Sequence, residues 1–387
     1  MKDIIYLDHA AATPLDPTVK EAMDEVAEIF ANPSSSTSLG QVAHERLEAA
    51  RKQVAMTLGA RSGEIIFTSG GTESDNLAIF AIARANKSAG QHLLTIPTEH
   101  KSVLACFEQL KKEGFEVEYV KVDKTGLIDL ADLKRKITPQ TTLISVAMAN
   151  SEIGTLQPVA EISRVVAETR KERKLAKNAT PLYFHTDAGA AAGQLSLAVS
   201  RLGVDAMSLN AAKIYGPKGS GVLYLRTGVR PEPQIVGGGQ EGGRRAGTEN
   251  LSAAVGLAAA LSAAEVVRST EVKRLLELRD YLITGLQKKF PKIIINGHRT
   301  KRLASNINFS LPGADGEDLV ARLDAAGIIV ATGAACTASS DAPSLVLTAI
   351  GRSEEEAHGS LRITLGRSTS LEHIKRFLKV LSEILSK

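Results

Sequence analysis

Lys213 is the clearest candidate for a reactive side chain, because it lies between a predicted strand and the turn-forming pair Gly216-Pro217. A lysine in a tight, partly buried turn can have a lowered pKa, and its neutral amine is then a nucleophile. Lys218 lies in the same segment, where an exposed loop lysine is the simpler interpretation. Spacing alone does not choose between the two lysines.

The two cysteines of the chain have different neighbours. Cys336 lies in a run of small residues, 331–341, where a thiol has no obvious packing role and a flexible loop could give it reach. The thiolate is the nucleophilic form of cysteine, so this position suits sulfur chemistry. Cys106 lies on an apolar helical stripe and is better interpreted as a buried core residue. Two thiols alone make a poor metal site, and we predict no metal.

The segment Ser69-Gly70-Gly71-Thr72 lies between a predicted strand and a predicted helix. Glycines allow a ligand to approach the backbone closely, and a helix start has free N–H groups at its positive end. Thr72 and Asp75 have the spacing of a helix capping box. The segment could bind a phosphate, although a glycine turn before a capped helix is often only a turn.

Asp187 ends a predicted buried strand, at the edge of an α/β sheet where ligands bind. A buried carboxylate needs a positive partner or several donors, and a protonated pyridine nitrogen would be such a partner. A helix N-cap is an equally good interpretation of Asp187.

The elements that must position these residues alternate between strand and helix, which predicts an α/β fold with a mostly parallel sheet covered on both faces. We expect helices at 17–30, 41–58, from 72, 101–113, 130–136 and 159–173. We expect strands at 64–67, 92–96, 116–120, 143–148, 182–186, 206–209 and 222–225.

An Ala/Leu-rich helical stretch at 251–289 contains the turn-prone Arg268-Ser269-Thr270, which could divide it into two helices. The elements after it are fewer and end in a helix at 371–385. We therefore predict a large domain at 15–258 and a smaller α+β domain formed by 1–14 and 259–387.

Composition excludes several classes of function. Lys and Arg number 47 against 43 Asp and Glu, a net charge of +4 that gives no case for nucleic acid. We find no apolar run of about 18 residues and predict no membrane span. Residues 1–9 lack the apolar stretch and cleavage site of a secretory signal, so we expect a cytoplasmic protein.

These segments, in this order, resemble the cysteine desulfurases, a branch of the class V aminotransferases. The resemblance runs from 6–14 to 361–367, and its most specific stretches are 67–76, 213–219, 237–241 and 245–248. It implies a fold-type I transferase that depends on pyridoxal 5'-phosphate, with a seven-stranded sheet in the large domain. It also implies a homodimer with active sites at the subunit interface.

The resemblance implies a role for each site residue. Lys213 would form a Schiff base with the cofactor, Asp187 would pair with its pyridinium nitrogen, and His100 would stack on the ring and take part in catalysis. The implied cofactor-binding residues are Gly71, Thr72, His100, Asn150, Ser151, Asp187, Ser208, Asn210, Lys213 and, reaching over to the other subunit, Thr248.

The resemblance also implies the substrate chemistry. Arg362 and Asn150 would bind L-cysteine, with Arg362 clamping the carboxylate. Cys336 would attack the substrate sulfur, leaving L-alanine and a persulfide for a sulfur-acceptor or scaffold protein.

Several positions depart from the family pattern, and among them Thr37 and Gln240 stand where histidines are common. Ser151 stands where Asn is usual, Ala190 where Gln normally bonds the ring oxygen of the cofactor, and Ala212 where His or Ser is usual. Each lost hydrogen bond is worth about 0.5 to 3 kcal/mol, so we expect cofactor binding to survive on the order of 10- to 1,000-fold weaker.

Three functions remain open. The leading one is an active desulfurase supplying sulfur for iron–sulfur clusters or tRNA thiolation, which the retention of Lys213 and Cys336 favours. A selenocysteine lyase-like enzyme would share the lysine and the fold. A degenerate, non-catalytic paralogue acting as a scaffold is favoured by Ala190 and Ala212.

Overall fold

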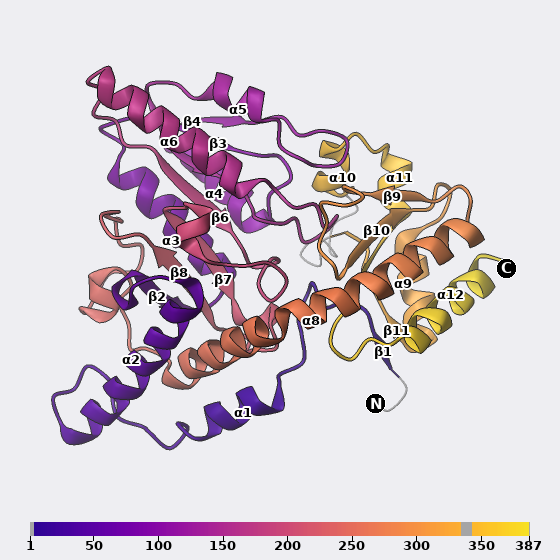
Figure 1. Ribbon diagram of the computed structural model, residues 1–387, viewed down its shortest axis with the longest axis horizontal. Coiled ribbons are helices and arrows are strands. Elements are labelled where there is room, and N and C mark those ends of the chain that lie inside the picture. Colours follow the sequence, from indigo (N-terminus) through magenta and orange to yellow (C-terminus); the bar gives the residue numbers. More distant parts are fainter. Residues whose placement is uncertain (1–3, 334–342, 387) are drawn as a thin grey trace.

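A seven-stranded sheet forms the centre of the protein, whose computed structural model describes residues 4–333 and 343–386 (Figure 1). The strand order is β2-β8-β7-β6-β5-β3-β4, and β8 alone runs antiparallel to its neighbours. The mostly parallel seven-stranded sheet is therefore confirmed. The strands are β2 (Ile65–Thr68), β3 (His92–Thr95), β4 (Glu116–Tyr119), β5 (Thr141–Ser145), β6 (Tyr183–Asp187), β7 (Ala206–Asn210) and β8 (Gly221–Leu225).

Most strands of the sheet are buried on both faces, because helices cover each side, and the edge strand β4 is partly exposed. Adjacent residues of one strand enter different clusters: Ile65 and Phe67 pack on one side and Ile66 on the other. This is the period of two that pleated strands impose. The helices are α1 (Pro17–Asp24), α2 (Ser38–Leu58), α3 (Gly71–Ala85), α4 (Lys101–Lys112), α5 (Leu130–Lys136), α6 (Val159–Leu175) and α7 (Val199–Leu202).

A second hydrophobic cluster, around Phe309, Leu361 and Phe377, lies beneath the C-terminal elements. An antiparallel sheet of order β12-β10-β9 forms its centre, and β1 pairs in parallel with β11 beside it. The division at 15–258 stays a prediction. The elements are β1 (Ile5–Tyr6), β9 (Ile294–Asn296), β10 (Asn306–Ser310), α9 (Gly316–Ala325), β11 (Ile328–Ile329), α10 (Leu345–Ala349), α11 (Glu354–His358), β12 (Ser360–Thr364) and α12 (Leu371–Leu385).

One helix, α8 (Leu251–Lys289), joins the two clusters (Figure 1). It places Leu257 in the first cluster and Leu282 in the second. The predicted break at Arg268-Ser269-Thr270 was wrong, because the 39 residues form one continuous helix. The ion pairs Arg268–Glu265 and Arg274–Glu271 stabilise the helix on both sides of that point.

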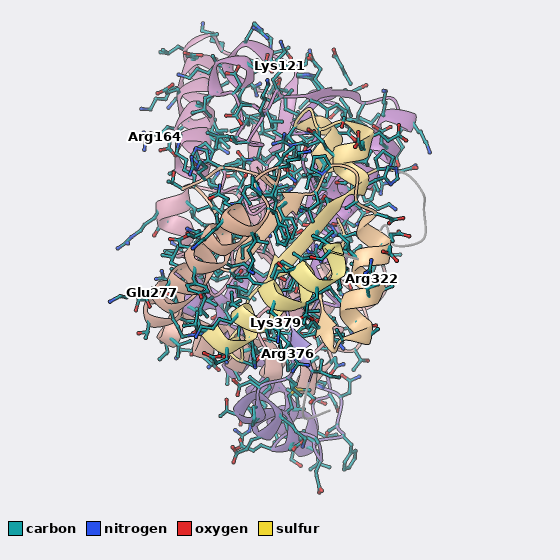
Figure 2. All side chains as sticks on the ribbon, turned by 90° about the vertical axis from the view of Figure 1, so that its right-hand side faces the viewer. Lys121, Arg164, Glu277, Arg322, Arg376 and Lys379 are labelled. Atoms are coloured by element: carbon teal, nitrogen blue, oxygen red, sulfur yellow. The ribbon has the colours of Figure 1, made fainter. Side chains whose placement is uncertain are left out.

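Helix α8 also meets the length and composition of a membrane span, with a hydropathy of 1.5, which the sequence expectation had not foreseen. The core helix of a folded protein meets the same criterion, and half of that window is buried here. Charged side chains, including Lys121, Arg164 and Glu277, extend outward from the ribbon (Figure 2).

Candidate active site

A cavity of about 430 Å³ lies at the carboxyl edge of the parallel strands. Asp187 ends β6, Lys213 ends the short turn of helix that follows β7, and His100 caps α4. This is the edge at which open α/β sheets bind ligands. The lining residues are Thr98, Glu99, His100, Lys101, Ala147, Ala149, Asn150, Ser151, Glu152, Asp187, Ala190, Lys213 and Val346.

The structure distinguishes the two candidate lysines. Lys213 lines the cavity, whereas Lys218 is exposed in the following loop. The backbone N–H of Lys213 donates to Oδ1 of Asn210 at 3.2 Å, which holds the turn closed. Asn210 also packs against the glycine turn, since a Cβ added to Gly71 would lie 3.2 Å from Asn210 Nδ2. Lys213 therefore lies close to both Asp187 and Gly71.

The start of α3 differs from the predicted capping box. The helix is capped by Gly70, which has a φ of 153° and no side chain, so the first amides of the helix receive no bond from their cap residue. The pairing of Thr72 with Asp75 was wrong, because the Asp75 carboxyl turns into the protein, where it lies 2.7 Å from Ser102 Oγ. The uncapped amides at Gly71 and Thr72 keep the geometry of an anion site.

Asp187 lines the cavity, and its interpretation as a helix N-cap was wrong, because a turn and not a helix follows it. Its Oδ1 accepts from the Gly189 N–H at 2.8 Å, so the carboxylate caps that turn. A Cβ on Gly189 would lie 3.1 Å from that oxygen, which is tight contact. The carboxylate is thus fixed at the edge of the cavity, facing the same space as Lys213.

Two further carboxyl groups belong to this region: Glu99, which lines the cavity and was not singled out from the sequence, and Asp75, which the sequence placed in a capping box. Burial raises the pKa of Glu99 and of Asp75 well above the usual range, and the charge of Asp187 adds to both effects. Glu99 accepts from the Ala147 N–H at 2.7 Å. Beside them, burial lowers the pKa of His185 to about 4. The position of Glu99 directly before His100 was the signal that the sequence offered.

Other predicted site residues have side chains that bond to the protein itself. Asn150 bonds backbone groups, donating to the Thr98 carbonyl at 2.7 Å and accepting from the amides of Glu152 and Ile153 at 2.8 Å each. Ser208 lies below the cavity, with its Oγ 2.9 Å from His185 Nε2. Neither the glycine turn nor Asn210 is among the lining residues.

The residues predicted to complete the site lie farther out. Arg362 is buried and donates from Nη2 to Asp8 at 2.7 Å. Within the described residues, the buried Arg362 Nε has no hydrogen-bond partner. Thr248 lines a different hollow, of about 600 Å³, beside Ser69. Cys336 lies outside the described residues.

A second cavity, of about 710 Å³, lies on the other side of Lys213 and extends along α8. It shares Ser151, Ala190 and Lys213 with the first cavity. Ser151 and Ala190, two of the positions that depart from the family pattern, therefore lie at the boundary between the two cavities.

Cys106 is confirmed as a core residue. It is 1% exposed, and burial raises the pKa of its thiol to about 12. A thiol with this pKa is not ionised near neutral pH, so Cys106 is a poor nucleophile.

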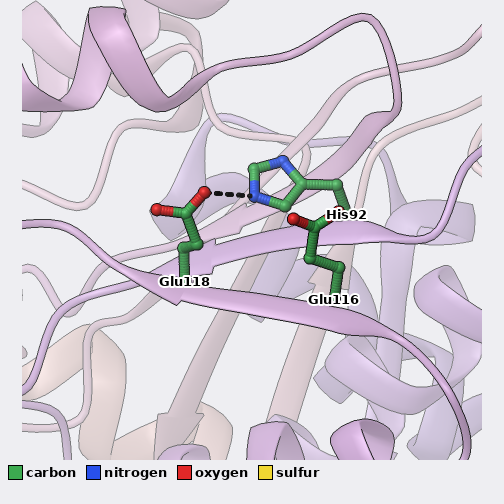
Figure 3. A group of neighbouring side chains, drawn as sticks. All are labelled: His92, Glu116 and Glu118. Carbon is green, nitrogen blue, oxygen red and sulfur yellow. Dashed lines mark ion pairs between the residues drawn. The ribbon is translucent and has the colours of Figure 1, made fainter.

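Within residues 4–333 and 343–386, one group of three side chains could hold a metal ion: His92, Glu116 and Glu118 (Figure 3). These residues begin β3 and β4, at the sheet edge opposite the cavity. Glu118 is bonded to Lys136 at 2.7 Å and lies 3.4 Å from His92 Nε2. The ion pair with Lys136 accounts for the position of Glu118 in this group.

Comparison with known proteins agrees with this geometry. The sequence model for aminotransferase class-V matches residues 5–377. The cysteine desulfurase IscS of Dictyoglomus turgidum is 44% identical, over 100% of this chain and 96% of that protein. A solved NifS-like protein superposes with a TM-score of 0.90 at 35% identity, over 99% of both chains. The structure of SspA in complex with cysteine gives a TM-score of 0.77 at 33% identity, over 93% of this chain and 98% of that one. The chain therefore belongs to the class V aminotransferases and, within them, to the cysteine desulfurase family.

Proposed function

We propose that the protein is a pyridoxal-phosphate-dependent cysteine desulfurase that converts L-cysteine to L-alanine and receives the sulfur on Cys336. One observation carries the proposal: Lys213, Asp187 and His100, from three different strand ends, line one cavity. A nucleophilic amine, a carboxylate and an imidazole are the groups that this chemistry requires.

The residues present fit pyridoxal phosphate. Lys213 would hold the aldehyde carbon covalently, Asp187 would hold the proton on the ring nitrogen, and His100 would cover the ring. The uncapped amides at the start of α3 would hold the phosphate, since Gly70 and Gly71 allow close approach. Ala190 and Ala212 offer no hydrogen-bond donors where the family pattern has them, so the cofactor would make fewer hydrogen bonds at these two positions.

When bound, the cofactor supplies an electron sink that weakens bonds around the substrate Cα. The residues of the chain do the rest. Arg362, whose Nε is buried, would bind the substrate carboxylate. His100 would move protons at the reacting carbon and sulfur.

Cys336 would take the sulfur by direct displacement. Its thiolate forms a bond to the substrate sulfur while the bond between that sulfur and the substrate Cβ breaks. The electron pair released at carbon takes up a proton, so the products are alanine and a persulfide on Cys336. The persulfide would pass to a sulfur-acceptor or scaffold protein for iron–sulfur clusters or tRNA thiolation.

The assembly and location complete the proposal. A homodimer would bring Thr248 of the partner subunit to the phosphate, which agrees with its position outside the cavity within one chain. We propose that the enzyme works in the cytoplasm.

The test begins with purified protein incubated with pyridoxal phosphate. We expect the absorption band of the lysine-bound cofactor, and alanine with sulfide when cysteine and a thiol reductant are added. Cys336→Ala should abolish sulfide formation and keep the band, whereas Cys106→Ser, the matched control, should leave both unchanged.

Each alternative gives a different result. A scaffold would form neither alanine nor sulfide, even with the cofactor in excess. A selenocysteine lyase-like enzyme would release alanine from selenocysteine and not from cysteine.

A further inference from the structure

His100 is bonded to Ser102, which is bonded in turn to Asp75, and the proposed mechanism uses neither of these buried residues. Its Nδ1 lies 2.6 Å from Ser102 Oγ and accepts from the Ser102 backbone N–H at 3.2 Å. Ser102 Oγ in turn lies 2.7 Å from Asp75 Oδ2. Asp75 and Ser102 come from α3 and α4, which pack side by side.

The backbone contact fixes the role of His100 Nδ1 in this chain of hydrogen bonds. An amide N–H can only donate, so His100 Nδ1 is an acceptor and carries no proton. When the Ser102 hydroxyl, 2.6 Å from the same nitrogen, also donates to it, the single hydroxyl proton is committed. In the 2.7 Å contact with Asp75 Oδ2, a protonated Asp75 then donates to the hydroxyl, whereas an ionised Asp75 would accept from it. The first of these arrangements needs a neutral Asp75.

The surroundings of Asp75 agree with a neutral acid. Asp75 is 1% exposed, and burial followed by the charge of Asp187 raises its pKa. The titratable groups that face it are Asp187, Lys213, Glu99, Cys106 and His185, whose Nε2 lies 3.8 Å from Asp75 Oδ1. The Ser102 and Ser208 hydroxyls, which could donate to an ionised Asp75, and the charge of Lys213 oppose the shift.

We propose that Ser102 and Asp75 are positioning residues for His100, which hold its Nδ1 as an acceptor, keep the ring proton on Nε2, and replace that proton when it is used. The step balances: Nε2 gives up its proton, Nδ1 takes the Ser102 proton, and Ser102 takes the Asp75 proton. Asp75 ends ionised and recovers its proton when the reaction reverses the transfer. The role in turnover rests on the proposed function, whereas the hydrogen-bond arrangement does not.

The first test reads the tautomer directly, by ¹⁵N NMR of the His100 ring. Wild type should show an acceptor Nδ1 and a protonated Nε2. Ser102→Ala removes the closer donor, at 2.6 Å, and leaves the backbone amide at 3.2 Å, so the share of the other tautomer should rise. Ser102→Thr should restore the wild-type signal. Ser163→Ala removes a hydroxyl that donates to the Gly203 carbonyl far from the site and should change nothing. A protonated Nδ1 in wild type would overturn the proposal.

The second test examines Asp75. Wild type should show the infrared band of a neutral buried carboxyl, and Asp75→Asn should lack it. The amide of that variant can still donate to Ser102, so the tautomer should stay, but it cannot supply a proton. If Asp75→Asn reverses the tautomer, Asp75 accepts rather than donates, and the direction that we infer is wrong.

The third test measures turnover. Since general acid–base catalysis contributes about 10²- to 10⁴-fold, we expect kcat for alanine formation to fall at least about tenfold in Ser102→Ala and in Asp75→Asn, with KM within about twofold. The pH profile of kcat should shift in both and recover in Ser102→Thr. Unchanged pH profiles would refute the relay. If wild type forms no alanine, the proposed function fails, and the NMR and infrared results still decide the arrangement.

Discussion

Two buried histidines of the same sheet show how its two edges differ. His185, on β6, lies between the hydroxyls of Ser145 and Ser208, at 2.9 Å from each. His92, at the start of β3, lies 2.7 Å from Thr141 Oγ1 and faces Glu118 at 3.4 Å. His185 is enclosed by two hydroxyl groups, whereas His92 faces a carboxylate at the start of its strand. Two equally buried histidines of one sheet therefore differ in the charge of their neighbours.

The largest expected effect comes from removing the reactive group at the cavity edge. Lys213→Ala should lower alanine formation from cysteine by more than about 10³-fold, because no other side chain replaces the amine. Lys218→Ala, a matched change in the same segment, should stay within about twofold. At the opposite edge, Glu118→Gln should also leave the rate unchanged. If the absorption band of the lysine-bound cofactor persists in Lys213→Ala, the assignment of Lys213 is wrong.

The next largest effect should be on stability in acid, to which the two histidines should contribute differently. Because burial lowers the pKa of His185 from 6.5 to about 4, the unfolded chain takes up this proton first as the pH falls. The free energy of unfolding therefore keeps its full value above pH 6.5 and falls by about 3 kcal/mol as the pH is lowered towards 4.

Urea unfolding at pH 7 and pH 4.5 measures this loss. His185→Gln should flatten the pH dependence. Burial also lowers the pKa of His92, but Glu116 and Glu118 oppose that shift. His92→Gln should therefore change the dependence less, and an equal effect of both variants would undo the comparison.

Asp187→Asn should have a smaller effect than the lysine variant. A charge-assisted hydrogen bond is worth about 1.5 to 3 kcal/mol, so cofactor affinity should fall on the order of 10- to 100-fold. Titration of the cofactor-free protein by absorbance gives the value. Glu118→Gln again serves as the control, since it removes a carboxylate at the other edge.

The smallest effect should be a gain. Ala190→Gln would restore a donor at the boundary between the two cavities, and one neutral hydrogen bond of about 0.5 to 1.5 kcal/mol should raise cofactor affinity about 2- to 10-fold. Ala190→Leu adds similar bulk without a donor and should not raise it. Equal gains in both variants would show that filling space, and not the bond, is responsible.

Most elements were predictable because local signals agree with the tertiary structure. The helices at Leu130–Lys136 and Leu371–Leu385 match at both ends, and each central strand lies within a few residues of its predicted range. The predicted helix at 17–30 is shorter, ending at Asp24. Position at strand ends also pointed to Lys213 and Asp187.

What the sequence could not supply is contact between distant segments. Asp75 has the spacing of a capping residue, and its inward turn depends on Ser102, which only the packing of α3 on α4 brings near. Glu99 gives no local sign of burial, because the sheet that encloses it is assembled from strands far along the chain. Arg268-Ser269-Thr270 looks like a turn, and the packing of α8 on both clusters overrides that preference.

The unbroken course of α8 has a mechanical consequence. At 1.5 Å per residue, its 39 residues form a rod of about 58 Å, anchored near one end by Leu257 and near the other by Leu286. A tilt of about 5° at Leu257 would displace Leu286 by roughly 4 Å. The rod therefore connects the two clusters rigidly, so that any tilt at one end would be carried, enlarged by its length, to the other.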